Sequence, residues 1–562
     1  MAKKASGPKW TAPDVVQVTY RLSDLPSAQH KAGLAGMVLQ IQAMHQDGSA
    51  ATKIPQIIEL TQDGATVEFS AQSIQELFDI LYDATKVEVE SDKPWPNATP
   101  LAEVQREVID EKGKKKKLRL FVYEDITPTG RYLRDRLSEG QQSWLRLWQK
   151  MLWDIPRGKP TTRIPFNERA EQKPVRLGKD AWDALVKNEK ARCSGQYVTD
   201  SISSALLLGA QSQSAESIAF AGRVDQTLLL HFWPLTVRVF VPRQISADGN
   251  TNSEGFTVAV PEVSNLAQFC QDYPKSLAVL GTETVGYRPL ESLIDIPDQS
   301  ALEFLDSLLE IAGSRGSDDM ISDSALSIEY FHMVKNGKNV KVAATGRIAP
   351  TADLIRKYRQ ISDRRTRLYR NSLFRACLLK ALLNGEAWYQ PFHKLMTTWP
   401  SAHFVPLDGQ TRDRPFFASD ARRRFEVLST VVVSQKGDFM SPPTSVPEDQ
   451  LAALVFRLVR TYVSQKVEAK TGLSWNDVRE ANETVEGKTK TVFLDAKERV
   501  VSDAFLAMRS RRERDFIDYF TATICSVKQF LKQDDYEVVA RALLARPEDV
   551  KTLCLLALSA NA

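Results

Sequence analysis

Apolar and polar residues alternate along residues 13–22, and alternation with a period of two predicts a strand with one buried face. Residues 57–69 repeat this pattern on both sides of Asp63-Gly64, a pair that favours the tight turn of a hairpin. A further alternating stretch surrounds Asn336-Gly337, which predicts a second hairpin. The early part of the chain is therefore expected to contain antiparallel sheet.

Apolar residues at helical spacing predict amphipathic helices between these strands. One helix begins at Ser73, where Ser73 as N-cap and Glu76 as the third helical residue would form a capping box. Another covers residues 300–313 and ends on a glycine. Residues 130–153 form a third helix, rich in arginine and tryptophan, whose tryptophans are best explained as core residues.

Two apolar runs, residues 228–235 and 236–242, have the β-branched and aromatic content of strands in a central sheet. His231 lies inside the first run, where a hydrogen-bonded core histidine is favoured over a ligand. A helix is expected to end at Gly209, before these runs. Both runs are then expected to lie in the core of the early part of the chain.

Helical periodicity dominates from residue 351 onward. Residues 351–435 are predicted as a mostly helical connecting region, and residues 440–562 as a helical bundle. The predicted fold class is α+β: a mixed α/β N-terminal region with antiparallel hairpins over residues 1–350, followed by a C-terminal all-α helical bundle.

The totals agree with a multidomain protein without a membrane span. A chain of 562 residues exceeds one core and predicts about two to four domains. No apolar run reaches the roughly 18 residues of a membrane helix. Five scattered cysteines have no disulfide or metal-ligand spacing, which predicts a reducing, cytoplasmic location.

Basic residues are grouped although the net charge is only +4. The groups lie at residues 112–117, 356–370, 422–424 and 509–514. Each group by itself fits a solvated surface. Four groups in a chain of nearly balanced charge predict local positive patches, as in proteins that contact a phosphate backbone. The group at residues 112–117 lies at the tip of a predicted hairpin over residues 105–124, as edge protection or as a nucleic-acid contact.

Two irregular polar stretches have the residue types that contact phosphates and base edges. The first is Ile155–Glu171, with three prolines and several basic residues, which is predicted to have little regular structure. The second runs from Gly209 to Arg223 and is rich in glutamine and serine.

Common catalytic signatures are missing from the sequence. It contains no GxxxxGK[ST], HExxH, HxH, CxxC or GxSxG pattern, and its six histidines are isolated from one another. These observations predict a protein that is not an enzyme and has no cofactor and no bound metal. A metal-dependent nuclease with a dispersed carboxylate site remains the alternative.

The segment Leu25–Met37, LPSAQHKAGLAGM, predicts a closely packed helix N-terminus. Ser27 is a candidate N-cap, and Gly33 and Gly36 would permit another backbone to approach. His30 and Lys31 would then form a basic rim.

This segment, GAQSQSAESIAFAGRV at residues 209–224, the run LLLHFWPL and the helical C-terminal part together resemble a known family. They are similar to the large subunit of a type I CRISPR Cascade, of the Myxan-type and cyanobacterial type I-B kind. The resemblance covers nearly the whole chain. It implies a non-catalytic subunit that recognises the PAM duplex, helps open target DNA and stabilises the R-loop.

The resemblance also implies the partners. These are guide RNA, target double-stranded DNA with its displaced strand, the Cascade backbone and 5′-handle-binding subunits, a small subunit, and a recruited helicase-nuclease or transposition adaptor.

Residue chemistry then selects candidate contacts on two loops, either of which could read the PAM. The candidates are Gln211, Ser212, Gln213, Ser214 and Arg223 on one loop, and Arg157, Lys159, Thr161, Thr162, Arg163 and Asn167 on the other. Candidate phosphate-backbone contacts are Lys114, Lys115, Lys116, Lys117, His30, Lys31, Arg364, Arg365, Arg509, Arg511 and Arg512.

Met440 stands directly before the predicted bundle, in the segment KGDFMSPPTSVP. The codons of the preceding Lys-Gly-Asp can form a purine-rich, ribosome-binding-like sequence. One hypothesis is that residues 440–562 are also made separately, as the small subunit; the alternative is an ordinary linker methionine.

Overall fold

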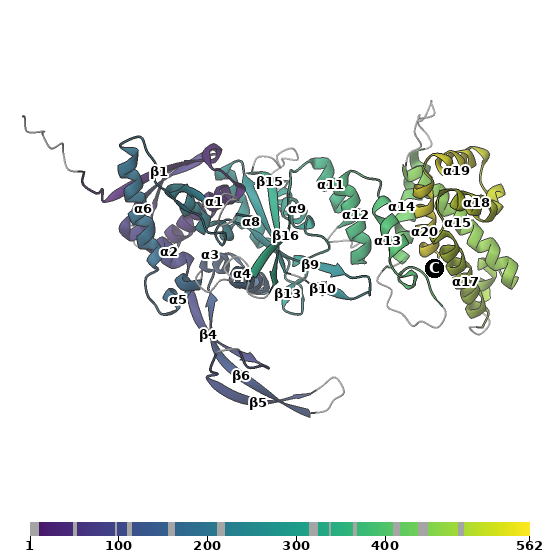
Figure 1. Ribbon diagram of the computed structural model, residues 1–562, viewed down its shortest axis with the longest axis horizontal. Helices are drawn as coiled ribbons and strands as arrows, with labels where there is room; N and C mark the ends of the chain where they lie inside the picture. Colours follow the sequence, from purple (N-terminus) through teal and green to yellow (C-terminus); the bar gives the residue numbers. More distant parts are fainter. Residues whose placement is uncertain are drawn as a thin grey trace, which may run out of the picture. The chain divides into compact units, whose positions relative to one another are not determined.

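The computed structural model divides the chain into two compact units, Met1–Pro242 with Glu254–Ala352, and Arg243–Ser253 with Asp353–Ala562 (Figure 1). The fold is α+β, as the sequence predicts. The structure describes residues 10–48, 53–95, 98–109, 115–154, 163–210, 220–253, 255–313, 324–336, 339–362, 368–407, 416, 418–435, 448–481 and 488–562.

The first unit begins with a small antiparallel sheet of order β1-β3-β2. Its strands are β1 (Val15–Arg21), β2 (Gln56–Leu60) and β3 (Gly64–Ser70). The alternation predicted for β1 and the hairpin at Asp63-Gly64 are confirmed. Helix α2 (Ala71–Leu81) follows β3 directly. The predicted capping box is wrong, because Ser70 is the N-cap and exchanges hydrogen bonds with Ser73.

Helix α1 (Ala28–Gln46) packs closely against the segment that was predicted as a buried strand at residues 228–235. Ser27 is its N-cap, as predicted. A Cβ atom added to Gly33 would lie 2.1 Å from the Leu229 carbonyl oxygen, and one on Gly36 would lie 2.3 Å from that of Phe232. The expected close approach of another backbone is therefore confirmed.

The strand predicted at residues 228–235 is wrong. This stretch forms two 3-10 turns, η5 (Leu228–His231) and η6 (Trp233–Leu235), after the short helix α7 (Val224–Thr227). Pro234 has no N–H to donate to a sheet, and its fixed φ angle suits the first turn of a helix. The second apolar run does continue into a strand, β9 (Arg238–Ile245).

The main sheet of the first unit has the order β9-β11-β15-β16, with β14 (Leu293–Ile294) parallel to β9. Strands β15 (Ala325–Asn336) and β16 (Asn339–Ile348) form the hairpin predicted near residue 337. Every residue of β11 (Phe256–Val263) is buried. Helices α1 and α9 (Gln299–Gly313) contact β11, and α8 (Leu266–Ala278) packs on both helices, so this sheet carries the core.

A third sheet, β4-β6-β5, extends from the rest of the first unit as a narrow ribbon (Figure 1). Its strands are β4 (Ala84–Ser91), β5 (Ala102–Ile109) and β6 (Lys115–Pro128). The predicted pairing of two strands around the lysine-rich tip is confirmed by the register from Ala102 opposite Val122 to Ile109 opposite Lys115. Helix α5 (Ile164–Ala170) contacts β4 and β6 (Figure 1).

The helix predicted over residues 130–153 is broken in two. Helix α3 (Arg131–Arg136) ends before a capping box between Ser138 and Gln141, and α4 (Gln142–Asp154) follows the turn η3 (Glu139–Gln141). Trp144 and Trp148 are buried, as predicted, and their indole N–H groups donate to backbone carbonyls.

The first unit also contains one longer helix, α6, and several short elements. They are η1 (Leu22–Asp24), α6 (Arg176–Arg192), β7 (Thr199–Ser201), β8 (Ala221–Arg223), β12 (Thr284–Val285), β13 (Arg288–Pro289) and η7 (Leu290–Ser292). The helix predicted to end at Gly209 is wrong, since residues 203–209 form turns.

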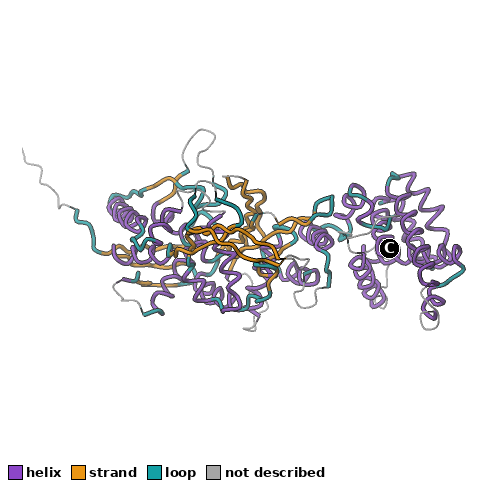
Figure 2. Tube along the Cα trace, turned by 90° about the horizontal axis from the view of Figure 1, so that it is seen from below, coloured by secondary structure: helices purple, strands orange, loops and turns teal. Residues whose placement is uncertain are grey.

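The described residues of the second unit from 353 onward form helices joined by loops (Figure 2). In chain order they are α11 (Ala352–Ile361), α12 (Ser372–Asn384), α13 (Gln390–Thr398), η8 (Ser401–His403), α14 (Ala418–Gln435), α15 (Glu448–Thr471), α16 (Trp475–Ala481), α17 (Lys488–Arg509), α18 (Glu513–Thr523), η9 (Ile524–Phe530), α19 (Gln533–Ala545) and α20 (Pro547–Ala560). The segment Arg243–Ser253 of this unit pairs the end of β9 with β10 (Thr251–Ser253).

One hydrophobic core joins the helices before the predicted linker to those after it. The rings of Phe425 on α14 and Phe456 on α15 stack with centroids 4.6 Å apart. The guanidinium group of Arg422 donates two hydrogen bonds to the Ala560 carbonyl oxygen at the end of α20. The linker residues 436–447, Met440 among them, lie outside the described residues. Within the described ranges, no helix is long and apolar enough to cross a membrane.

Candidate nucleic-acid interface

The start of the glutamine- and serine-rich loop is held by helix α1. The side-chain amide of Gln29 accepts a hydrogen bond from the Leu208 N–H (2.8 Å) and donates one to the Leu208 carbonyl oxygen (3.1 Å). The indole N–H of Trp233 donates to the Leu206 carbonyl oxygen at 2.7 Å. Gln211, Ser212, Gln213 and Ser214 themselves lie outside the described residues.

The end of the same loop is held by the short ladder between β7 and β8. Arg223, the last residue of β8, forms a two-pronged ion pair with the buried carboxylate of Asp225. Its guanidinium group also lies 3.9 Å from the ring centroid of Tyr197. Partial burial disfavours the charged form, but the hydrogen bonds and charge of Asp225 outweigh it and raise the pKa of Arg223. Arg223 is therefore a fixed charge at the loop base.

The other predicted loop has a described base as well. Arg157, Lys159, Thr161 and Thr162 lie outside the described residues, whereas Arg163 is placed. Its guanidinium group lies 4.3 Å from the ring centroid of Trp153 and donates to the Trp153 carbonyl oxygen. Burial lowers the pKa of Arg163.

The prediction of little regular structure through residue 171 is wrong for its second half. Residues 164–170 form helix α5, with a proline in the first turn, where its missing N–H costs nothing. Asn167 is therefore an exposed helical residue rather than a loop residue.

The two loop bases line the same cavity. Its volume is about 310 Å³. Ile164 and Pro165, just after one loop, lie on its wall, and so do Ala205 and Leu206, shortly before the other. The remaining lining residues are Tyr82, Glu168, Arg176, Leu177, Asp180, Ser203 and His231. Two loops that the sequence offered as alternatives thus have their bases at one place in the first unit.

Tyr82 and His231 form the aromatic part of the lining of this cavity. The Tyr82 hydroxyl and the Nδ1 atom of His231 are 2.7 Å apart, so His231 is hydrogen-bonded as predicted, although it is half-buried and lines the cavity rather than lying fully in the core. The Tyr82 ring packs edge-on against Phe166, whose centroid is 5.0 Å away. Phe166 packs in turn against Trp153, beneath Arg163. One continuous aromatic group therefore connects the cavity to the base of the loop at residues 155–162.

The predicted basic rim on α1 is wrong. His30 is 3 % exposed, and its Nδ1 atom lies 2.7 Å from the Ser27 hydroxyl. Burial lowers the pKa of His30 to about 4, so its ring is neutral at pH 7 and has no charge for a phosphate. Lys31 is partly buried in an ion pair with Glu262 (3.0 Å), and Glu262 also binds Arg347 and the Ser327 hydroxyl. Lys31 therefore ties α1 to the main sheet.

The lysine-rich hairpin has balanced charges over its described part. Arg119 on β6 pairs with Glu103 on the neighbouring strand β5. Arg106 on β5 pairs at 2.6 Å with Glu90 on β4, the strand on the other side of β6. Leu101, directly before β5, and Val104 on β5 are exposed. Lys114 and the side chains of Lys115, Lys116 and Lys117 lie outside the described residues.

The arginines of the second unit differ in their exposure and in their contacts. Arg509 donates to the carbonyl oxygens of Thr397 and Trp399 and to the Ser401 hydroxyl, so its predicted place on a basic outer face is wrong. Arg511 is half-buried over the Tyr519 ring. Arg512 is exposed. Arg364 and Arg365 lie outside the described residues.

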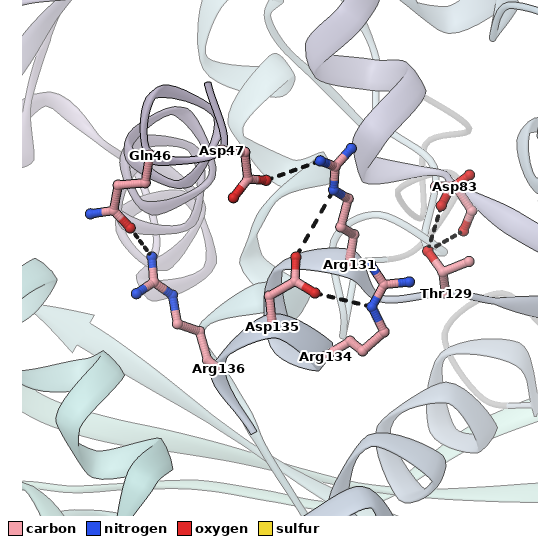
Figure 3. Close-up of polar contacts among 8 residues, drawn as sticks. All are labelled: Gln46, Asp47, Asp83, Thr129, Arg131, Arg134, Asp135 and Arg136. Carbon is pink, nitrogen blue, oxygen red and sulfur yellow. Dashed lines mark hydrogen bonds and ion pairs between the residues drawn. The ribbon is translucent and has the colours of Figure 1, made fainter. Parts of the chain in front are cut away.

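Helix α3 carries an arginine group that is not among the predicted site residues (Figure 3). Arg131 pairs at 3.0 Å with Asp47, the residue directly after α1. Arg136 donates a hydrogen bond at 2.7 Å to Gln46, the last residue of α1. Arg134 pairs with its neighbour Asp135. The arginine-rich sequence RYLRDR could have indicated this group. However, its arginines pair with the protein residues named above, so these contacts stabilise the fold.

Comparison with protein families gives the same assignment for both parts of the chain. Residues 54–317 match the family described as Type I-B CRISPR Cas8b N-terminal domain, and residues 325–561 match Type I-B CRISPR Cas8b C-terminal domain. The chain belongs to the Cas8b family. It is therefore a type I-B large subunit, as the resemblance predicted, from a family of non-catalytic Cascade subunits that act with CRISPR RNA and DNA. A search of the curated proteins found no match to this Cas8b chain.

The described residues of this Cas8b protein contain no group of three or more histidine, cysteine or acidic side chains placed to hold a metal ion.

Proposed function

We propose that this Cas8b subunit recognises the PAM duplex with both predicted loops together and helps open the adjacent target DNA. The observation that carries the proposal is the shared cavity between the two loop bases. Because both loops begin and end in the first unit and their bases line one cavity, they can reach adjacent parts of one DNA duplex.

In this proposal, Gln211, Ser212, Gln213 and Ser214 contact base edges, and Arg157, Lys159, Thr161 and Thr162 contact the neighbouring backbone. Arg223 and Arg163 are held against aromatic rings at the loop bases, so they supply charge at fixed positions. Lys114–Lys117 of the ribbon and Arg512 of the helical unit would add phosphate contacts that do not depend on sequence. The subunit would then stabilise the R-loop and recruit the helicase-nuclease or transposition adaptor.

The test is a complex assembled with guide RNA, in which Gln211, Ser212, Gln213 and Ser214 are replaced by alanine. We expect the ratio of affinities for target DNA with and without the PAM to fall at least tenfold, because base-edge contacts supply that discrimination. A matched variant in the ribbon, Lys115→Ala with Lys116→Ala, is expected to weaken both targets equally. Unchanged discrimination in the loop variant would contradict the proposal.

We also propose that residues 440–562 are made separately from Met440 as the small subunit. The helices before the linker share one core with those after it, so a separate product would expose the surface that Phe425 and Arg422 cover in the full chain. Such a product would need a partner on that face. Expressing the gene with the Met440 codon changed to a non-start alanine codon (Met440→Ala) should remove a product of roughly 14 kDa, and persistence of that product would disprove internal initiation.

A further inference from the structure

The cavity beneath the two loops has the size of a site for one small flat molecule. Its volume of about 310 Å³ lies at the lower end of the roughly 300–1,000 Å³ typical of ligand pockets. A double-stranded segment is too wide for it. Because Tyr82 and Phe166 are almost fully buried and pack against each other, the aromatic end of the cavity is rigid.

The lining divides by chemistry. Ile164, Pro165, Leu177 and Leu206 provide apolar walls, and the Tyr82 hydroxyl and His231 ring provide polar atoms at the aromatic end. This combination suits a planar heterocycle, whose faces pack on apolar and aromatic groups while its edge forms hydrogen bonds.

The rim carries charge. The Arg176 side chain is 81 % exposed and lies 3.6 Å from Asp180, which partly balances it. Glu168 accepts a hydrogen bond from the Arg176 backbone N–H at 3.1 Å. Arg176 is thus positioned to contact the phosphate next to a base that enters the cavity, whereas both acidic groups already have partners.

We propose that this cavity receives one unpaired nucleobase from the DNA next to the PAM; the inference rests on the proposed PAM recognition by the two loops. Ile164 lies one residue after Arg163 and Leu206 lies four residues before Ala210, the described residues that border those loops, so a base released from a duplex held by the loops is close to the cavity. Removing a base from the stack costs free energy, and its burial among aromatic and apolar groups offsets part of that cost. The base could come from the target strand or from the displaced strand.

The test uses the complete complex with guide RNA and a target that carries 2-aminopurine at the first positions beside the PAM. One set of targets has the label on the target strand, and the other has it on the displaced strand. In the unaltered complex, we expect one labelled position on one strand to change fluorescence at least threefold. The strand that responds identifies the source of the base, and no response on either strand would overturn the inference.

Cavity-filling variants locate the site. Ala205→Trp should abolish the fluorescence change and slow R-loop formation on a fully paired target at least tenfold, while a target with mismatches beside the PAM is opened at the normal rate. Ile164→Trp provides a second variant, because Ile164 is 50 % exposed at the mouth and tolerates a larger side chain. The control is Leu544→Trp on α19, where the side chain is 75 % exposed.

Different results would contradict base binding in the cavity and PAM recognition by the loops. If the loop variants lose PAM discrimination while Ala205→Trp and Ile164→Trp keep the fluorescence change, the cavity is not the site and PAM recognition stands. If the loop variants keep PAM discrimination, the proposed function fails.

Discussion

The side-chain amide of Gln29 pairs with the backbone of Leu208 through two hydrogen bonds, one in each direction. The pair joins the first turn of α1 to the residues that lead into the glutamine- and serine-rich loop. Gln29 is 2 % exposed, so bulk water could not take the place of these two hydrogen bonds if they were removed. The position of the loop base therefore depends on a residue 179 positions earlier in the chain.

Replacing Gln29 by methionine should displace that loop base. The change leaves the N–H and carbonyl groups of Leu208 buried without these partners, at a cost of about 1–3 kcal/mol each. We expect lower stability in thermal unfolding and at least fivefold weaker binding of PAM-containing DNA by the assembled complex. Gln17→Met is the control, because Gln17 is exposed and its side-chain amide donates to the Glu68 carboxylate at the surface. Equal effects of the two variants would contradict the role assigned to Gln29.

Alanine at Gly33 or Gly36 should destabilise the first unit. The added Cβ atom would overlap the carbonyl oxygen of Leu229 or Phe232, so α1 must move away from the 3-10 turns. Overpacking of this kind costs about 1–3 kcal/mol. Denaturant unfolding of the full chain measures the loss. Gly313→Ala is the matched control at a helix end, since an added Cβ meets no atom of the described chain within 4 Å there. A stability of Gly33→Ala equal to that of this control would refute the close-contact argument.

His30 should make the stability depend on pH. Its pKa is about 4 in the folded chain because of burial, whereas the unfolded value is near 6.5. Between these values the unfolded state binds the proton and the folded state does not, so the free energy of unfolding falls as pH decreases from about 6.5 to 4. The loss contributed by this one group is roughly 3 kcal/mol.

Unfolding curves of His30→Gln and the unaltered chain at several pH values provide the measurement. The variant should lose part of the pH slope in that window. His45→Gln, at an exposed position on the same helix, should keep the slope. An unchanged slope in His30→Gln would show that His30 does not titrate as described.

Substitution of Arg509 should lower stability, whereas substitution of Arg512 should weaken DNA binding. Arg509→Ala removes hydrogen bonds to two carbonyl oxygens and a hydroxyl group, which should lower the stability of the helical unit by about 2 kcal/mol. Arg512→Ala should leave stability unchanged, weaken DNA binding by the complex and reduce the salt slope by about one. Melting temperatures and binding at several salt concentrations test both. The opposite pattern would place the phosphate contact on Arg509.

Features that depend on neighbouring residues were predictable. The hairpins at Asp63-Gly64 and near residue 337 follow from turn chemistry between alternating strands. Ser27 as the N-cap of α1 follows from local hydrogen bonding, and the cap exists. The glycine spacing of α1 predicted a close approach, although not its partner.

Other predictions failed where distant contacts decide the structure. Residues 228–235 are as apolar as a central strand, yet the approach of Gly33 and Gly36 and the presence of Pro234 give 3-10 turns instead. A basic run does not reveal which arginine faces inward, and for Arg509 the acceptors are more than 100 residues away.

The sequence by itself determined the α+β class, the hairpins, the family and the two polar stretches, because turn residues, periodicity and motifs act between neighbours. The tertiary structure alone decided that His30 is neutral in the core and that the bases of the two loops line one cavity. Tyr82, Ile164, Leu206 and His231 meet there although they are widely separated in the chain. Such a meeting depends on how helices and turns pack, and packing is a sum of long-range contacts that no local pattern records.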